Sequence, residues 1–350
     1  MSNTNTILKK LLRGKKACSP ISHLWLKRFN GTMIKGARQI GQGEYGKVFR
    51  GCIDDKCEKY IVYKETTDPS AKMEFTIAKK LEEFSVPKMY LYKNCDNKDV
   101  LYSEYIRGEE LGKWWKSSPS LAASKSVMAQ VIYNLYKIQQ KYPGFRHHDL
   151  HSGNILVRSV PKRNIQIKLN EKTFTIPNGG VEAVIIDFGF SVFPRIKNPL
   201  INNKNYINIG ISRKSDKMYD LHFFLNSMYA LVRQPKTMTE RRIHNFIRSV
   251  LPFEYLNKKT ERIKNYRMRG NMNHGSIPNF EKVLNKPFFT GENPKALPIP
   301  ITKPQKPVVL LPNKPKTPVN QKEAMARAIA ILKTKKTKQQ KRRPAPRIKV

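Results

Sequence analysis

Alternating and helical patterns of apolar residues divide the chain into a strand-rich part and a helix-rich part. From Gln39 the segment IGQGEYGKVFRG is followed by KYIVYKE, and these two β-branched and aromatic runs predict a hairpin of an antiparallel sheet. Asp68 and Pro69 predict the start of a helix over about residues 70–84, and the runs KMYLYK and VLYSEYI predict a further strand pair. Over residues 121–141 apolar positions recur at helical spacing, which predicts a long amphipathic helix.

A second group of elements follows this long helix. The runs ILVRSV, IQIKLN, FTIP and EAVIIDFGF predict short strands, with Asn-Gly-Gly at 178–180 as a turn. After Asp220 the run LHFFLNSMYALV has a helical pattern, and NFEKVLNKPFF predicts the end of the globular part near residue 290. We therefore expect one globular domain over residues 33–290.

The segments on either side of this domain have a different composition. Residues 1–32 are basic and weakly patterned, which is typical of an extension. Residues 291–350 are rich in Pro and Lys, hold sixteen Lys and Arg against two Glu, and include runs that cannot sustain a regular helix or ladder. We predict a disordered basic tail, in which residues 321–333 could form one short helix.

The charge of the whole chain indicates a partner. The 350 residues include 67 Lys and Arg against 26 Asp and Glu, which gives a formal net charge of +41. This excess is larger than solubility requires, and it favours an anionic partner such as nucleic acid, a phosphate-rich ligand or an acidic membrane surface. The alternative interpretation is a highly soluble basic surface without such a partner.

Cysteine usage and hydropathy bear on the location of the protein. The four cysteines, at positions 18, 52, 57 and 95, are too scattered for a disulfide scaffold or a metal finger, and we expect reduced thiols. No apolar run approaches the roughly 20 residues that span a bilayer, and the N-terminus lacks the apolar core of a secretory signal. These features predict an intracellular protein without a membrane span.

The first chemical signal is a glycine-rich turn. Gly41, Gly43 and Gly46 lie between two predicted strands, where the absence of side chains lets backbone amides approach phosphate oxygens. Lys64, one strand later, carries an ammonium that could reach the α and β phosphates of a nucleotide. Taken alone, the turn also fits a plain glycine-rich hairpin, and Lys64 fits a solvated strand lysine.

Two later stretches establish a resemblance to a known family. The stretch RHHDLHSGNILV (146–157) is similar to the catalytic loop H-R-D-x-x-x-x-N, and VIIDFGF (184–190) is similar to the metal-binding D-F-G. With the glycine-rich turn and Lys64 in the same order, the chain resembles a divergent eukaryotic-type protein kinase. Such a kinase has an α+β fold of two lobes, which implies a small antiparallel-sheet N-lobe over about 33–107 and a mainly helical C-lobe over about 108–290.

The resemblance implies roles for individual residues. Asp149 would accept or orient the proton of the attacking hydroxyl, while Asn154 and Asp187 would hold Mg²⁺ against the phosphates of ATP. Glu74 would pair with Lys64, although the resemblance leaves open an exposed helix Glu. The resemblance implies these nucleotide-binding residues: Ile40, Gly41, Gly43, Gly46, Val48, Lys64, Glu104, Ile106 and Glu110. Asp220 resembles the helix Asp that braces the catalytic loop, with a simple capping Asp as the alternative.

The chain also departs from the family pattern. His148 replaces the usual Arg before the catalytic Asp, His151 replaces the Lys that Ser/Thr kinases place two residues after it, and no A-P-E triplet follows. A His at position 151 is similar to the loops of small-molecule phosphotransferases. The segment between Asn154 and Asp187 is longer than usual, with room for an inserted hairpin. Divergent kinases with basic tails resemble those of large DNA viruses, which would place the protein in a virion or a host cell.

These observations predict an ATP- and Mg²⁺-dependent protein kinase that acts on Ser or Thr of a protein substrate. Its basic tail is expected to bind nucleic acid or another polyanion. A small-molecule phosphotransferase is the first alternative. The second is a nucleic-acid-binding scaffold built on a retired kinase fold, although Lys64, Asp149 and Asp187, which such scaffolds lose, are all present.

Overall fold

The structure, a computed structural model, describes most of the expected globular domain. The described residues are 18, 26–29, 32–35, 37–43, 46–54, 58–170, 172–201, 203–270, 272, 274, 275 and 277–291. The predicted disordered tail therefore lies, from residue 292 onward, outside the described residues.

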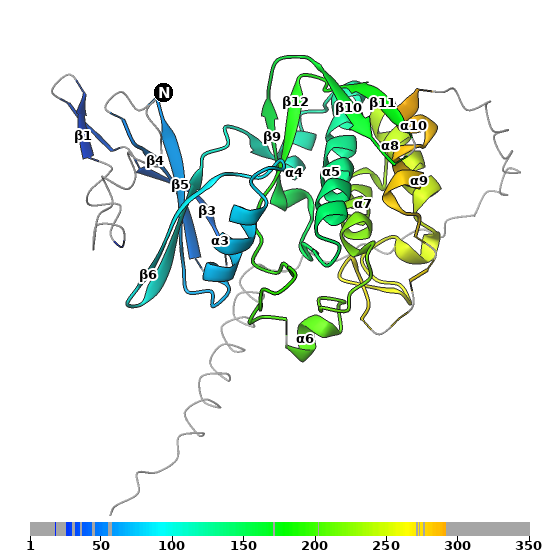
Figure 1. Cartoon of the computed structure of the whole chain (residues 1–350). Helices are drawn as coiled ribbons and strands as arrows, with labels where there is room; N and C mark the ends of the chain where they lie inside the picture. Colours follow the sequence, from blue (N-terminus) through cyan, green and yellow to red (C-terminus); the bar gives the residue numbers. More distant parts are fainter. Residues whose placement is uncertain are drawn as a thin grey trace, which may run out of the picture. The chain divides into compact units, whose positions relative to one another are not determined.

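A five-stranded antiparallel sheet forms the N-terminal region, with the strand order β3-β4-β5-β7-β6 (Figure 1). Its strands are β3 (Ala37–Gln42), β4 (Gly46–Cys52), β5 (Tyr60–Thr66), β6 (Met89–Cys95) and β7 (Lys98–Glu104). Both predicted strand pairs are thus confirmed. The β-branched and aromatic side chains that predicted them form a small core on this sheet, in which Ile61, Tyr63 and Tyr102 are fully buried.

Helix α3 (Ala71–Lys80) contacts β6 and β7. It buries Ile77 and Ala78. The predicted start at Asp68 and Pro69 was wrong, because Ser70 is the N-cap and makes no side-chain capping bond. The Asp68 carboxylate instead accepts a hydrogen bond from the Ser70 amide at 2.8 Å, which forms a turn before the helix.

A separate two-stranded hairpin, β1 (Leu26–Phe29) and β2 (Thr32–Lys35), precedes the main sheet. It crosses residue 33, where the sequence predicted the domain to begin. The predicted boundary therefore divides a structural unit, since strands of four residues give too short a pattern to be recognised.

The C-terminal region is mainly helical and surrounds α5 (Leu121–Lys141), which matches the predicted long helix (Figure 1). Its apolar face is buried, with Val127, Leu135 and Ile138 fully enclosed. The other helices are α4 (Leu111–Trp115), α6 (Lys204–Ile207), α7 (Tyr219–Val232), α8 (Met238–Val250), α9 (Phe280–Leu284) and α10 (Pro287–Thr290), with short 3-10 helices at Ser152–Asn154 (η2) and Phe253–Tyr255 (η3).

Short strands complete this region. β8 (Glu109–Glu110), β9 (Ile155–Ser159) and β12 (Val181–Ile185) form one antiparallel sheet, and β13 (Ile263–Lys264) pairs with β14 (Arg267–Met268). Between β9 and β12, β10 (Asn164–Lys168) and β11 (Thr173–Pro177) form the inserted hairpin that the sequence predicted. Ile167 and Ile176 anchor this hairpin in the core, and the Tyr133 hydroxyl accepts a hydrogen bond from the Lys168 amide at 3.1 Å.

The cysteine prediction was wrong. Cys18 and Cys95 form a disulfide whose Cα atoms are 5.8 Å apart, and Cys52 is disulfide-bonded as well. The two partners of the first bridge are 77 residues apart in the chain, so their spacing carries no signal, and only the path of the backbone brings them together.

Within the part of the chain that the structure describes, no helix combines the length and the apolar character that crossing a membrane requires.

Candidate active site

The predicted catalytic loop connects α5 to β9, and its backbone is hydrogen-bonded to a residue of α7. The backbone amides of His147 and His148 donate to the two carboxylate oxygens of Asp220 at 2.7 and 2.8 Å. All three side chains are fully buried, and His148 has a φ of 64°, which turns the chain sharply before Asp149. Asp220 therefore makes the bracing contact that the resemblance implied, from the first turn of α7.

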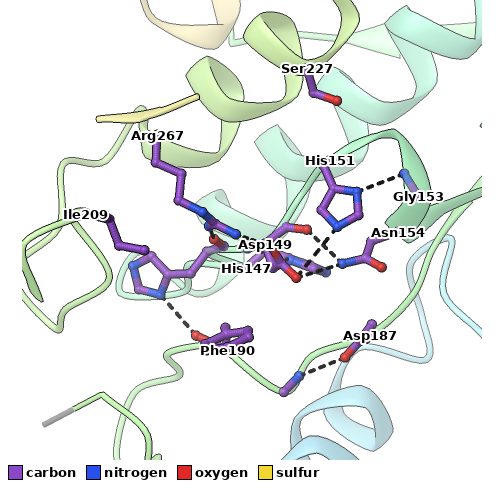
Figure 2. A network of polar contacts seen from close by, with 12 residues as sticks. His147, Asp149, His151, Gly153, Asn154, Asp187, Phe190, Ile209, Ser227 and Arg267 are labelled. Atoms are coloured by element: carbon purple, nitrogen blue, oxygen red, sulfur yellow. Dashed lines mark hydrogen bonds and ion pairs between the residues drawn. The ribbon is translucent and has the colours of Figure 1, made fainter. Parts of the chain in front are cut away.

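Asp149 and Asn154 are linked directly (Figure 2). The Asn154 Nδ2 group donates to the backbone oxygen of Asp149 at 2.9 Å and to its Oδ2 atom at 3.0 Å. His151 lies beside them: its Nδ1 atom accepts from the Gly153 amide at 2.9 Å, and its Nε2 atom is 3.8 Å from Asp149 Oδ2. The accepting Nδ1 leaves the proton of a neutral ring on Nε2, which faces the carboxylate.

Arg267, on β14, is a site residue that the sequence analysis missed. Its guanidinium donates to Asp149 Oδ1 and to the backbone oxygen of His148 (Figure 2). The guanidinium also lies 4.1 Å from the ring centroid of Phe223. It is separated from Asp149 by 118 residues and belongs to a two-residue strand. No motif or spacing could have connected the two positions.

Lys64 joins the sheet to the second predicted motif. Its Nζ atom is 2.8 Å from Glu74 Oε2 on α3 and 3.7 Å from Asp187 Oδ1. Burial disfavours the ammonium, but Glu74 and Asp187 outweigh it and raise the pKa of Lys64. Burial also raises the pKa of Glu74 to about 6, against the pull of Lys64. The expected pairing of Lys64 with Glu74 is thus present, and an exposed helix Glu is excluded.

The backbone conformation and a local hydrogen bond fix the carboxylate of Asp187. Its φ is 66°, and its Oδ1 atom accepts from the Gly189 amide at 3.3 Å. Burial opposes its ionisation, yet Lys64 and the Gly189 amide together lower its pKa below the ordinary value. The side chain is 44% exposed, so the carboxylate is open to a ligand.

The donor set fits a divalent cation bound together with a nucleotide. Asn154 uses its amide nitrogen on Asp149, which leaves the amide oxygen for a cation, and Asp187 offers a carboxylate. Among the described residues, no three His, Cys, Asp or Glu side chains cluster as a metal cage. Mg²⁺ usually takes one or two protein oxygen ligands and completes its shell with phosphates and water, which agrees with a site of this kind.

The glycine-rich turn lies at the ends of β3 and β4. The Gly43 amide donates to the Gly46 oxygen at 2.9 Å, and a Cβ atom at Gly46 would lie 2.0 Å from the Glu65 oxygen, so this position requires glycine. Gly41 pairs with Val48, and Val48 also pairs with Lys64 across the sheet. Ile40, which precedes the turn, is 44% exposed.

Three further residues that the resemblance implied for nucleotide binding lie between the end of β7 and the end of β8: Glu104, Ile106 and Glu110. The Glu104 amide donates to the Lys88 oxygen at 2.8 Å, and its carboxylate lies 3.8 Å from Arg158 Nη1. Ile106 is buried, and its oxygen accepts from the Gly108 amide at 2.9 Å. Glu110 pairs with Lys113 at 3.0 Å, so the structure gives Glu110 a local partner on α4.

Comparison with known proteins agrees with this geometry. Residues 34–205 match the protein kinase domain model. Over 217 residues the chain is 29% identical to a protein of Acanthamoeba polyphaga mimivirus named as a serine/threonine-protein kinase, covering 59% of this chain and 43% of that protein. A second mimivirus protein named in the same way is 27% identical over 173 residues, covering 46% of this chain and 43% of the relative.

Serine/threonine-protein kinase haspin of Mus musculus is 33% identical over 88 residues, which is 25% of this chain and 12% of haspin. The chain thus spans less than half the length of each of these relatives. The matched model, the sheet and helices over the matched residues and the mimivirus relatives together show that residues 34–205 carry a protein kinase domain.

Proposed function

We propose that this chain is an ATP-dependent protein kinase that transfers the γ-phosphate to Ser or Thr hydroxyls of a protein substrate. One observation carries the proposal: Lys64 bridges Glu74 and Asp187, while Asn154 holds Asp149, so that a cation, three acidic groups and an amide converge from four separate segments. This convergence is what phosphoryl transfer needs for positioning and charge stabilisation.

Each group has a role that its surroundings support. Lys64 binds the nucleotide phosphates, and Asn154 and Asp187 hold Mg²⁺ through their oxygens. Asp149 orients the acceptor hydroxyl and takes its proton. Bound ATP with Mg²⁺ supplies the phosphoryl group and neutralises part of its charge. Ile40, Gly41, Gly43, Gly46 and Val48 would enclose the nucleotide, with Glu104, Ile106 and Glu110 on its adenosine side.

The direct test removes the carboxylate of Asp149. The Asp149→Asn variant should lose about 100- to 10,000-fold in transfer rate, because the amide cannot take the proton, while ATP affinity stays nearly unchanged. Rates are measured with labelled ATP and Mg²⁺, and affinity by calorimetry. Asp96→Asn, in an exposed turn outside the site, is the matched control. Unchanged turnover in the Asp149 variant would overturn the assignment.

The class of acceptor is a separate question. The names of the relatives favour Ser and Thr of proteins. His151 keeps a small-molecule phosphotransferase open, and a scaffold without activity is opposed by the retained Lys64, Asp149 and Asp187. Parallel assays with protein and peptide acceptors and with hydroxyl-bearing metabolites separate these functions, because each predicts transfer to a different panel or to none.

The surface around residues 190–217 supports an acidic protein substrate. Arg195, Lys197, Lys204, Arg213 and Lys214 are all exposed, and no acidic residue precedes Asp216 in this segment. Such a surface attracts acidic groups at low ionic strength. Ser peptides with acidic flanks should therefore be phosphorylated faster than peptides with basic flanks, and the difference should shrink as salt is added.

We also propose that residues 291–350 bind nucleic acid or another polyanion, on the basis of their sixteen Lys and Arg. If they neutralise on the order of six phosphates, the log-log slope of affinity against salt is about −5. Truncation after Thr290 should remove most of this affinity. An unaltered slope after truncation would indicate a tail without this role. With viral relatives, the protein is proposed to act inside a host cell or a virion.

A further inference from the structure

Arg267 occupies a place at the centre of the site that no motif assigns. Arg267 and its ion-pair partner Asp149 are both nearly enclosed, since their side chains are 13% and 17% exposed. The guanidinium spans two groups of the loop, the Asp149 carboxylate and the His148 oxygen. The two contacts compensate for the burial of the charge, because an unpaired guanidinium would be costly to bury.

The rest of the contacts hold Arg267 in one orientation. Its guanidinium lies over the Phe223 ring on α7, and β14, which carries it, also contacts α7. Burial disfavours its charge, but the Tyr219 phenol and the Asp149 carboxylate raise the pKa of Arg267 overall. The planar guanidinium is therefore charged, stacked and fixed before any substrate arrives.

The two oxygens of Asp149 are thereby divided between two partners. Oδ1 accepts from Arg267, and Oδ2 accepts from Asn154 and faces His151. A carboxylate bound at both oxygens cannot rotate freely, so the lone pairs left for an acceptor hydroxyl point in a defined direction. Arg267 thus determines the orientation of the group that receives the proton.

The catalytic loop lacks a permanent cation because His151 stands where the family pattern has Lys. The family pattern places a Lys two residues after the catalytic Asp, and this chain has His there, whose Nδ1 is already used on the Gly153 amide. The imidazole is 41% exposed and has no permanent charge, whereas a guanidinium stays protonated at all working pH values.

We propose that Arg267 is a positioning residue of the phosphoryl-transfer site, supplying from the β13–β14 hairpin the cation that the catalytic loop lacks. This inference rests on the proposed kinase function and deepens it. Arg267 acts through Asp149, because it orients the carboxylate that is proposed to take the proton.

The test compares Arg267→Ala, Arg267→Lys and a control in the same hairpin. Lys264 is the cross-strand partner of Arg267 and is exposed, which makes Lys264→Ala the matched control. Misplacing a catalytic group by about 1 Å can cost about 100-fold in rate, so kcat should fall by about that factor in Arg267→Ala. The KM for ATP should stay within about threefold of the wild-type value, because Arg267 touches no predicted nucleotide-binding residue.

Chemical rescue separates positioning from mere structural support. Adding methylguanidine to Arg267→Ala should restore at least about tenfold of the lost kcat, since the small cation can fill the vacated space beside Asp149. Arg267→Lys should be intermediate, because an ammonium cannot bind both loop groups bidentately. Thermal unfolding curves establish that each variant is folded.

The outcomes separate this inference from the proposed function. If the wild-type chain transfers phosphate and Arg267→Ala has an equal or higher kcat, the role of Arg267 is overturned while the proposed function stands. A folded Arg267→Ala that methylguanidine does not rescue, or an equal loss in Lys264→Ala, would overturn it as well and indicate support of the hairpin. Absence of transfer by the wild-type chain on every acceptor would overturn the proposed function, and this role with it.

Discussion

Glu74 shows how one buried residue can make activity depend on pH. Its carboxyl is enclosed on α3, where burial raises its pKa to about 6, and its only described cationic partner is Lys64 at 2.8 Å. When the carboxyl binds a proton, it no longer anchors the ammonium that is proposed to hold the phosphates. The residue thus connects helix packing to catalysis.

We predict that kcat/KM falls as the pH drops through about 6. Glu74→Gln, which fixes the neutral form, should be slow at pH 8 and should lack this acidic limb. Glu83→Gln, at an exposed position just after the same helix, should keep the limb. An identical acidic limb in Glu74→Gln would show that another group titrates.

The loss of activity would not come from unfolding through this group. The folded chain holds the Glu74 proton more tightly than the unfolded chain, whose carboxyl has a pKa of 4.5. Protonation of Glu74 therefore adds stability as the pH falls from about 6 to 4.5. Circular dichroism recorded at the same pH values distinguishes the two effects.

At the scale of elements, the segment after the D-F-G motif is held at both ends by one imidazole. His148 Nδ1 is 3.1 Å from the Phe190 oxygen, and Nε2 is 2.7 Å from the Ser215 hydroxyl. Burial lowers the pKa of His148 to about 4, so the ring is neutral, donates to Phe190 and accepts from Ser215. The segment is thus tied to the catalytic loop without a phosphate.

We therefore predict that the kinase is active without phosphorylation of this segment. In kinases switched in that way, the Arg before the catalytic Asp pairs with the added phosphate. Here a buried neutral His148 takes the place of that Arg. The segment contains Ser191, Ser212 and Ser215, and Ser191 is itself buried. The test is to treat the protein with phosphatase, confirm by mass spectrometry that Ser191, Ser212 and Ser215 are bare, and measure initial rates.

A rate reduced about tenfold or more, and restored by autophosphorylation, would contradict this prediction and assign the phosphate clamp to another cation. Ser215→Ala gives a second readout, because it removes the hydroxyl that His148 accepts from and should loosen the segment. Ser212→Ala, three residues earlier, is the control.

How far the sequence predicts this fold depends on the length of each signal. The long helix 121–141, both strand pairs of the sheet and the inserted hairpin were recognisable because their apolar periodicity extends over several residues. Helix α8 went unnoticed, although Thr237 and Glu240 form a capping box and Ile243, Phe246 and Ile247 follow at helical spacing. A search for that pair of signals would have found it.

The residues of the candidate site also differ in how far the sequence predicts them. Asp149, Asn154 and Asp187 belong to short contiguous motifs, so their positions could be predicted from sequence alone. Their pairing partners at a distance were less accessible: the disulfide of Cys18 and the ion pair of Arg267 depend on chain paths of 77 and 118 residues. Only tertiary structure brings such residues together.

At the scale of the whole molecule, buried histidines make the fold sensitive to acid. His147, His148 and His222 are fully enclosed, and burial lowers the pKa of each, to about 4 for His148 and His222. The unfolded chain has the ordinary value of 6.5 and binds protons first. Their contribution to stability is complete above pH 6.5 and is lost as the pH falls toward about 4.

We predict a lower urea midpoint at pH 5 than at pH 7.5. A shift from 6.5 to about 4 corresponds to on the order of 3 kcal/mol per group once both states are fully protonated, of which part is lost at pH 5. His222→Gln should show a smaller midpoint difference between the two pH values than the wild type. His244→Gln, on a partly exposed face of α8, should not. Equal differences in both variants would contradict this account.

The ion pair between Arg267 and Asp149 has a consequence for the comparison of relatives. The kinase domain match ends at residue 205, so Arg267 lies outside the region on which such matches are scored. If the guanidinium replaces the missing loop lysine, the residues at positions 151 and 267 should change together among relatives. Relatives with Lys at the first position are then free to vary at the second, whereas those with His should retain Arg. An alignment extended through the β13–β14 hairpin would reveal this covariation as a signature of a distinct branch of the superfamily.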